Sequence, residues 1–80
     1  MPRYFFDTDN HTHDGDNEGT DLADDDEARV QAIIFAGDYL RDHPGIVSAG
    51  NRFSVSVRDA RDSILLTVVV TVEDPREPSE

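Results

Sequence analysis

The stretches RFSVSVR (residues 52–58) and ILLTVVVTV (residues 64–72) decide the fold. The first alternates apolar and polar side chains, as a half-buried β-strand does. The second is also expected to be a strand, with Leu66, Val68, Val70 and Val72 on one face and Leu65, Thr67, Val69 and Thr71 on the other. Residues 59–62, DARD, form the turn between them. We therefore predict an antiparallel hairpin at this end of the domain.

A helix is predicted before the hairpin. Asp24 is the expected N-cap, and the acids that follow it suit the positive end of the helix dipole. A period of 3.6 residues gathers one apolar face, made of Ala28, Ala32, Phe35, Ala36 and Tyr39. Pro44 and Gly45 end the helix. The small alanines allow this face to pack closely on a sheet.

Two more strands are predicted on the N-terminal side of the helix. Residues 2–8, PRYFFDT, have three consecutive aromatics, and Tyr4 and Phe6 point away from the face that carries Phe5. Residues 9–17 are mostly turn formers and make a loop. Residues 18–22, EGTDL, form a short strand that pairs back on the first.

The predicted architecture is α+β over residues 1–72, in the order ββαββ. One antiparallel sheet carries a single helix on one face. Residues 45–51 form a connector, whose Ile46 and Val47 are expected at the edge of the core. Residues 73–80, EDPREPSE, have no apolar side chain and are expected to be a disordered acidic tail.

Composition excludes several classes of function. The net charge of −11 repels nucleic acid and anionic lipid. With no cysteine, neither a disulfide nor a Cys-based zinc site is available. The longest apolar run has about half the twenty residues that a membrane-spanning helix needs. The N-terminus has no signal-peptide pattern, so we expect a soluble cytoplasmic protein that binds neither nucleic acid nor membrane.

The acidic residues are concentrated at one end of the chain. Between Tyr4 and Ala28 there are ten Asp and Glu residues and no Lys or Arg. This stretch is interpreted either as a solvated loop or as a site for a cation or a basic partner. Arg52, Arg58 and Arg61 gather on the hairpin, where they form surface ion pairs or reach the acidic loop of a neighbouring subunit.

The acidic loop also contains the candidate metal ligands, which are Asp7, Asp9, His11, His13, Asp14 and Asp16. Imidazole and carboxylate groups bind zinc, nickel or manganese. Residues 14–25 partly match a calcium-binding loop, with Gly19 at the invariant glycine position. Its last position is Asp25 instead of Glu, and no helix precedes it.

Catalytic patterns are absent from the sequence. There is no cysteine nucleophile and no nucleophile elbow, and Gly15 and Gly19 lie in a loop too acidic to cradle phosphate. We therefore expect a protein that is not an enzyme and that carries no cofactor.

Several of these features together resemble a known family. They are the MPRYFF start, the Asp/Gly-rich loop, the segment from Glu18 to Leu22, the alanine-rich helix and the final hairpin. The chain is similar over residues 1–72 to the DUF6894-type proteins of unknown function found in rhizobia and related alphaproteobacteria. Asp7 stands where family members usually have a histidine, and the loop is longer here. The resemblance implies a cytoplasmic bacterial protein with no assigned activity.

Two functions are compatible with these features. The first is a small acidic interaction or regulatory protein whose acidic end meets a basic protein partner. The second is a cation-binding module that uses residues 7–25. Self-association as a homodimer is also expected, because Phe5, Leu65 and Val69 leave the face of the sheet away from the helix partly apolar. Val30 and Ile34, outside the packed helix face, are a second candidate for a subunit contact.

Overall fold

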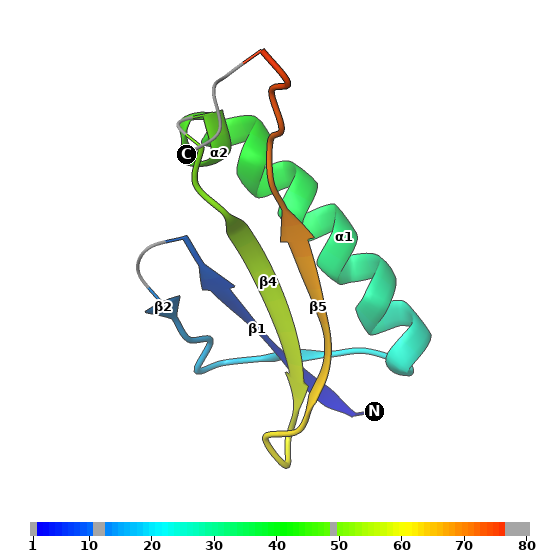
Figure 1. Cartoon of the computed structure of the whole chain (residues 1–80). Coiled ribbons are helices and arrows are strands. Elements are labelled where there is room, and N and C mark those ends of the chain that lie inside the picture. The colour runs from blue at the N-terminus through cyan, green and yellow to red at the C-terminus, as the bar shows by residue number, and fades with distance from the viewer. Residues whose placement is uncertain (1, 11–12, 49, 77–80) are drawn as a thin grey trace.

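The computed structural model describes residues 2–10, 13–48 and 50–76, and it contains one antiparallel sheet with one main helix on one face (Figure 1). The elements are β1 (Arg3–Asp9), β2 (His13–Asp14), β3 (Thr20–Asp21), α1 (Asp25–Asp42), α2 (Gly45–Ser48), β4 (Phe53–Asp59) and β5 (Ile64–Val70). The α+β fold and the predicted order are confirmed. Two short elements are added, because the loop forms the two-residue strand β2 and the connector forms α2.

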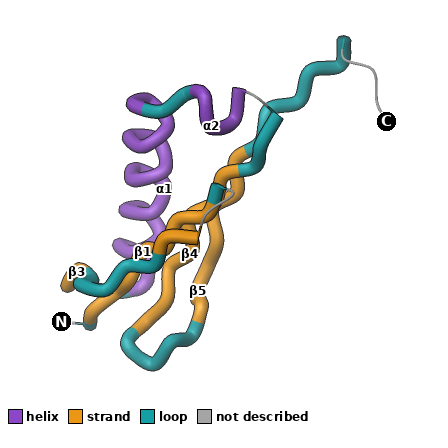
Figure 2. The backbone as a smooth tube through the Cα atoms, turned by 90° about the vertical axis from the view of Figure 1, so that its left-hand side faces the viewer, coloured by secondary structure: helices purple, strands orange, loops and turns teal. Residues whose placement is uncertain are grey.

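The sheet is open, with the strand order β2-β1-β4-β5. β1 pairs with β4 along most of its length, from Tyr4 opposite Asp59 to Asp9 opposite Ser54. On its other side, β3 pairs with the beginning of β1 and β2 pairs with its end. β5 completes the predicted hairpin and forms one edge of the sheet. Figure 2 shows α1 lying along one face of this sheet.

The core lies between α1 and the sheet. Its largest fully buried side chains are Tyr4, Phe53, Val55 and Val57. They meet the three predicted alanines of α1, which are buried: Ala28, Ala32 and Ala36. Because the alanine side chain is short, the helix backbone lies close to the strands. The apolar side chains between them are therefore closely packed. Leu22 and Val47 close the core from the sides, as the sequence predicts.

The start of α1 is fixed by the N-cap that the sequence predicts. The Asp24 carboxylate accepts a hydrogen bond from the Glu27 N–H at 2.9 Å. The Glu27 carboxylate in turn accepts one from the Ala23 N–H at 2.7 Å. This reciprocal pair resembles a capping box, and it fixes where the chain turns into the helix.

The face of the sheet away from α1 is less apolar than predicted. A β-bulge opposite Val57 and Arg58 shifts the register of β5, and Leu65 packs against the core instead of facing away from it. Phe5 is covered by the Arg58 guanidinium, whose Cζ atom lies 4.8 Å from the centre of the ring. Val69 remains exposed. Ile64, which pairs with Arg58, is exposed as well. The sheet therefore keeps a smaller apolar surface than expected, made mainly of Val69 and Ile64.

Other expectations concern the helix exterior and the tail. Val30 and Ile34 are exposed, and so is Ile33. Of the predicted disordered tail, residues 77–80 lie outside the described residues, and residues 73–76 contain neither helix nor strand. Within the described ranges, no helix has both the length and the apolar composition required to cross a membrane.

Candidate functional site

An open groove lies beside α1, on the side away from β5. The helix packs over β4 and β5, so the helix side of β1 is covered less completely. The segment that carries β2 and β3 forms the opposite wall. The groove between them has a volume of about 450 Å³. This lies within the range of small-ligand sites, roughly 300–1,000 Å³.

Aromatic side chains form the inner surface of the groove. Phe6 of β1 meets Phe35 of α1 edge to face, with ring centres 6.3 Å apart. Phe35 meets Tyr39 in the same way at 6.0 Å. Tyr39 also stacks on the buried Phe53 at 5.1 Å, which fixes its ring against the core. Each of these three lining rings is only partly buried, so part of its apolar surface remains open to a ligand.

Polar groups surround these rings. Gln31 contributes from α1, Thr8 from β1 and Thr20 from β3. Asp14 and Asp16 contribute from the opposite wall. Within the described part of the chain, the Asp14 carboxylate makes no ion pair, and Asp14 is exposed. The groove therefore joins an aromatic floor to an acidic rim.

The acidic rim is held in place by Asp16. Its carboxylate accepts hydrogen bonds from three backbone N–H groups, those of Phe6 at 3.1 Å, Glu18 at 3.0 Å and Gly19 at 3.1 Å. The bond from Phe6 lies between the parts of β1 that pair with β2 and β3. The Asp16 side chain thus takes the place of a strand partner at this point.

A second anchor joins this loop to the hairpin. The Asp7 carboxylate accepts hydrogen bonds from Arg58 Nε at 2.7 Å and from the Asp16 N–H at 2.8 Å. Arg58 also donates to the Asp16 carbonyl oxygen at 2.8 Å and to the Asp62 carboxylate at 2.9 Å. Arg58 therefore reaches the acidic loop of its own chain. From the sequence, one possible partner of this arginine was the acidic loop of a neighbouring subunit.

These contacts keep the carboxylates of Asp7 and Asp16 ionised. Burial raises the pKa of Asp7, but the hydrogen bonds from Arg58 and the Asp16 N–H outweigh it, so the pKa lies below its ordinary value. Burial also raises the pKa of Asp16, and the N–H groups of Glu18, Gly19 and Phe6 more than compensate. Both groups are therefore negative at neutral pH.

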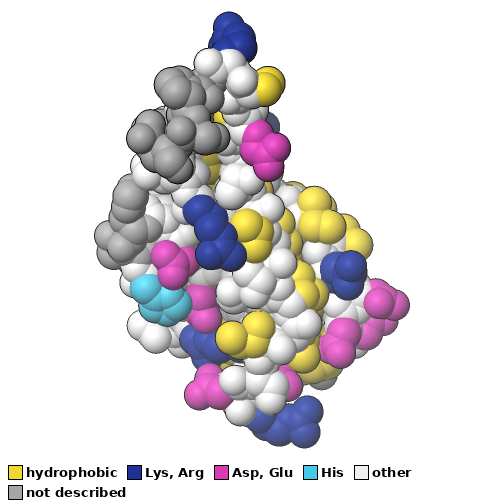
Figure 3. Space-filling model, viewed as in Figure 1, with side chains coloured by type: hydrophobic (Ala, Val, Ile, Leu, Met, Phe, Trp, Pro, Cys, Tyr) yellow, Lys and Arg dark blue, Asp and Glu magenta, His cyan; other side chains and the backbone are white. Residues whose placement is uncertain are grey.

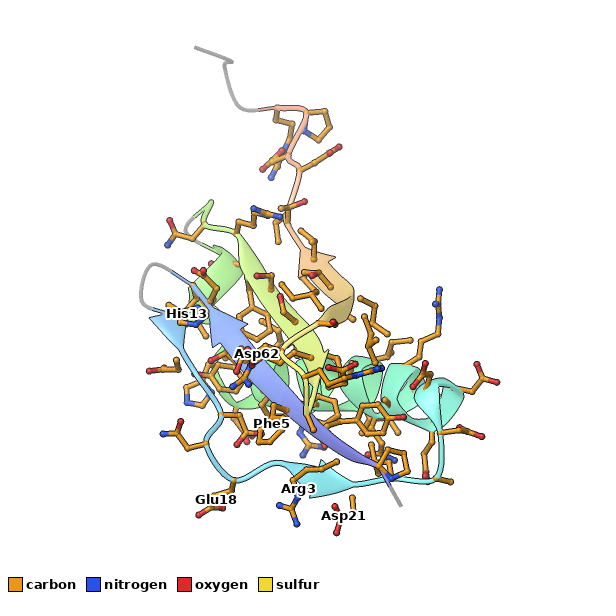
Figure 4. The ribbon with its side chains drawn as sticks, turned by 90° about the horizontal axis from the view of Figure 1, so that it is seen from below. Arg3, Phe5, His13, Glu18, Asp21 and Asp62 are labelled. Atoms are coloured by element: carbon orange, nitrogen blue, oxygen red, sulfur yellow. The ribbon has the colours of Figure 1, made fainter. Side chains whose placement is uncertain are left out.

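A third contact fixes the other end of this segment, at Glu18 and Asp21. Arg3 donates to the Glu18 carbonyl oxygen and pairs with Asp21, with 3.3 Å between Nε and Oδ1. Figure 4 shows Arg3 with Glu18, Asp21 and Phe5 along this edge of the molecule. Gly19 lies between them with a positive φ of 77°. This conformation explains why the Glu18–Leu22 motif carries a glycine.

The predicted metal ligands are only partly brought together. Asp7 and Asp16 are bound to Arg58 and to backbone N–H groups. Asp9 Oδ2 lies 3.8 Å from His13 Nδ1 across the β1–β2 pair. His11 lies outside the described residues. Among the residues that are described, no group of three His, Cys, Asp or Glu side chains is arranged to hold a metal ion. The metal site stays a prediction.

The calcium-loop match can be compared with the same geometry. Asp16, at its third position, is turned toward backbone N–H groups. Asp25, at its last position, begins α1 and accepts a hydrogen bond from the Tyr4 hydroxyl at 2.7 Å. The carboxylates of Asp16 and Asp25 thus have partners within the protein itself.

The aromatic lining of the groove was not predicted as a site. The sequence assigns Phe35 and Tyr39 to the packed face of the helix, which is correct for one side of each ring. The spacing of these two residues, one helical turn, was the pattern that could have indicated the lining, because it places their rings next to each other on the helix. Whether these rings are covered depends on where residues 14–22 lie, and no local pattern specifies this.

The structure is a small α+β domain built on an open antiparallel sheet, with a groove beside α1. The sequence belongs to the family described as Domain of unknown function (DUF6894), which matches residues 3–71. This match spans every helix and strand of the structure. No curated protein and no solved structure matches the chain. The family carries no assigned function, so the function has to be argued from the groove.

Proposed function

We propose that this protein is a non-catalytic interaction protein that binds a basic segment of a partner protein in the groove. The observation that carries the proposal is the combination of an aromatic floor with an acidic rim. An Arg or Lys side chain has an apolar stem and a cationic end. The stem fits against Phe35 and Tyr39, and the cationic end meets Asp14. Cations also bind favourably over the faces of aromatic rings.

The charge of the whole protein supports a basic partner. The net charge is −11. The rim residues Asp14 and Asp16 are two of the ten acids between Tyr4 and Ala28. A field of one sign attracts a partner of the opposite sign and raises its association rate. Asp14 is the rim carboxylate best placed to use this attraction, because Asp16 is already bound to three N–H groups.

The chemistry of the groove supports binding without catalysis. Its described lining contains no His, Lys, Cys or Ser. The hydroxyl groups present are those of threonine and tyrosine, and among the described residues none of them is hydrogen-bonded to a carboxylate or an imidazole. Catalysis by an activated nucleophile needs such a pair within hydrogen-bonding reach. We also place the protein in the bacterial cytoplasm, which the lack of cysteine and the resemblance to alphaproteobacterial proteins support.

Calorimetric titration with an Arg-Gly-Arg peptide amide tests the proposal. We compare Asp14→Asn with Asp26→Asn, which removes the same charge from the exposed start of α1. Asp14→Asn is expected to weaken binding about fivefold, because an exposed ion pair contributes up to about 1 kcal/mol. Asp26→Asn is expected to change it less than about twofold.

Two further results bear on the proposal. Binding of the peptide should weaken as salt is added, because exposed charges are screened. The aromatic floor is tested with Phe35→Leu, which should weaken binding while the circular dichroism spectrum stays the same. Equal effects of Asp14→Asn and Asp26→Asn would mean that the peptide senses only the overall charge, and the groove would then not be the site.

A further inference from the structure

The two edges of the sheet differ in how they are covered. At the β1 edge, β2, β3 and the Asp16 side chain bind the backbone of the strand. At the other edge, β5 pairs with β4 on its inner side, and no described segment pairs with its outer side. The free N–H and C=O groups of an edge strand form a template for another strand. Proteins usually block such an edge with a charged side chain or a proline.

β5 has neither kind of block. From Ile64 to Val72 the chain contains no charged residue and no proline. Its one irregularity, the bulge opposite Val57 and Arg58, lies at the end next to the turn. Val69 is exposed on this strand, and hydrophobic side chains gather over β5 and the adjoining part of α1 in Figure 3. Beyond the bulge, the edge is thus regular, uncharged and rich in β-branched side chains.

The neighbouring flank of α1 carries an exposed apolar side chain, Ile33, one turn after Arg29. Gln31 lines the groove on the β1 side of the helix. Ile33 lies two residues further along, or about 200° round the helix, so it belongs to the flank on the β5 side. It is 56% exposed. Figure 1 shows α1 extending beyond β5 on this side. A strand added to β5 would therefore lie beneath the helix flank that carries Ile33.

We propose that this edge binds a second copy of the chain, with the two β5 strands pairing antiparallel across a two-fold axis and Ile33 of one α1 packing against α1 of its partner. The result is one continuous sheet with both helices on the same face. A closed two-fold contact of this kind uses the same surface on both chains.

The spacing of the elements fits this arrangement. α1 packs over both β4 and β5. Strands in a sheet are about 4.8 Å apart. Two helices that each lie midway between β4 and β5 are then about 10 Å apart across the axis. Packed helices have axes roughly 8–10 Å apart. The helices can therefore meet without moving from their place on the sheet.

The distribution of charge favours a second copy as the occupant. A protein of net charge −11 repels its own copies, and the repulsion is least where the charges are furthest apart. Pairing through β5 places the two β2 edges seven strand spacings apart, which is about 34 Å. This is well beyond the Debye length of about 8 Å at physiological salt. A basic partner, by contrast, would be drawn to the acidic end.

Sedimentation equilibrium at micromolar concentration tests the proposal, with Ile33→Lys and Ile34→Lys as a matched pair. Ile34 is 49% exposed but is turned about 100° away from Ile33, toward the groove flank. The wild type and Ile34→Lys are expected to have a molecular mass of twice the 8.9 kDa of one chain. Ile33→Lys is expected to have the mass of a single chain. All three should give the same circular dichroism spectrum.

Amide hydrogen exchange locates the contact. In Ile33→Lys, those amides of Ile64–Val70 that point away from β4 should exchange at least tenfold faster than in the wild type, while those of β1 stay unchanged. A wild type that sediments as a monomer would overturn the proposal. A dimer that dissociates on Ile34→Lys but not on Ile33→Lys would overturn it too, as would a dimer whose β5 amides exchange no more slowly than those of the monomer.

Discussion

The Arg58 guanidinium in β4 donates two hydrogen bonds to the Asp7 carboxylate in β1, at 2.7 Å from Nε to Oδ2 and at 3.3 Å from Nη2 to Oδ1. The two residues are 51 positions apart in the sequence. Asp7 is one of the most buried charged groups of the described chain, with 8% of its surface exposed. Because Asp16 is bound to both residues, this pair joins the two central strands to the acidic wall of the groove.

Asp7→Asn should destabilise the fold. Asparagine keeps the shape of the side chain but loses the charge that binds Arg58. Hydrogen bonds to charged groups contribute roughly 1.5–3 kcal/mol, so we expect a loss of about 2 kcal/mol in the free energy of unfolding, measured with urea. The control is Asp9→Asn, in the same strand but exposed, which should cost less than about 0.5 kcal/mol. Equal losses in the two variants would contradict a special role for Asp7.

Gly19 and Gly37 should respond to alanine in opposite directions. Gly19 has φ of 77°, and a Cβ atom there would lie 2.8 Å from Arg3 Cγ and 2.9 Å from Phe5 Cε2. Gly37 lies within α1, and a Cβ atom there would have no neighbour within 4 Å. We expect Gly19→Ala to cost at least about 1 kcal/mol and Gly37→Ala to add roughly 0.5–1 kcal/mol. Thermal unfolding of both variants gives the comparison, and a stabilised Gly19→Ala would contradict the conformation of the loop.

Added salt should stabilise the protein. The ten acids between Tyr4 and Ala28 repel one another in the folded state, and salt screens exposed charges. The melting temperature should therefore rise between low and moderate NaCl. Asp14→Asn, which removes one exposed charge from the acidic loop, should raise the melting temperature more at low salt than at moderate salt. A melting temperature that falls as NaCl is added would count against this repulsion.

The sequence predicts those elements that depend on local patterns. The alternation of residues 52–58 and the acids after Asp24 are sufficient for the final hairpin and for the helix start, and both are confirmed. Leu22 reaches the core as predicted, because the short strand that precedes it pairs back on β1. These features need information only from neighbouring residues or from one strand pair.

The features that were missed depend on contacts between distant residues. The pairing of Arg58 with Asp7 requires the register of β1 on β4, which no local pattern specifies. The bulge that moves Leu65 to the core adds one residue to a strand whose alternation otherwise looks regular. The groove follows from the position of α1 over β4 and β5 instead of over β1. Its aromatic residues looked like core residues because one side of each ring is in the core.

The Tyr4 hydroxyl gives a prediction for alkaline pH. Its hydrogen bond to Asp25, its burial and the charge of Asp25 raise the pKa of Tyr4 from 10.0 to about 12. The phenol thus loses its proton more readily in the unfolded chain than in the folded one. The stability due to this group is complete below pH 10 and is lost as the pH rises toward about 12.

Tyr4→Phe tests this prediction, because phenylalanine has no proton to lose. The variant should be less stable than the wild type at neutral pH, and the difference should shrink as the pH rises from 10 to 12. In the wild type, the phenolate absorbance of Tyr4 should develop near pH 12, and Asp25→Asn should shift it to lower pH. Tyr39→Phe is the control, since it leaves the Tyr4 signal in place. A Tyr4 signal that develops at pH 10 in the folded protein would show that the bond to Asp25 does not hold the phenol.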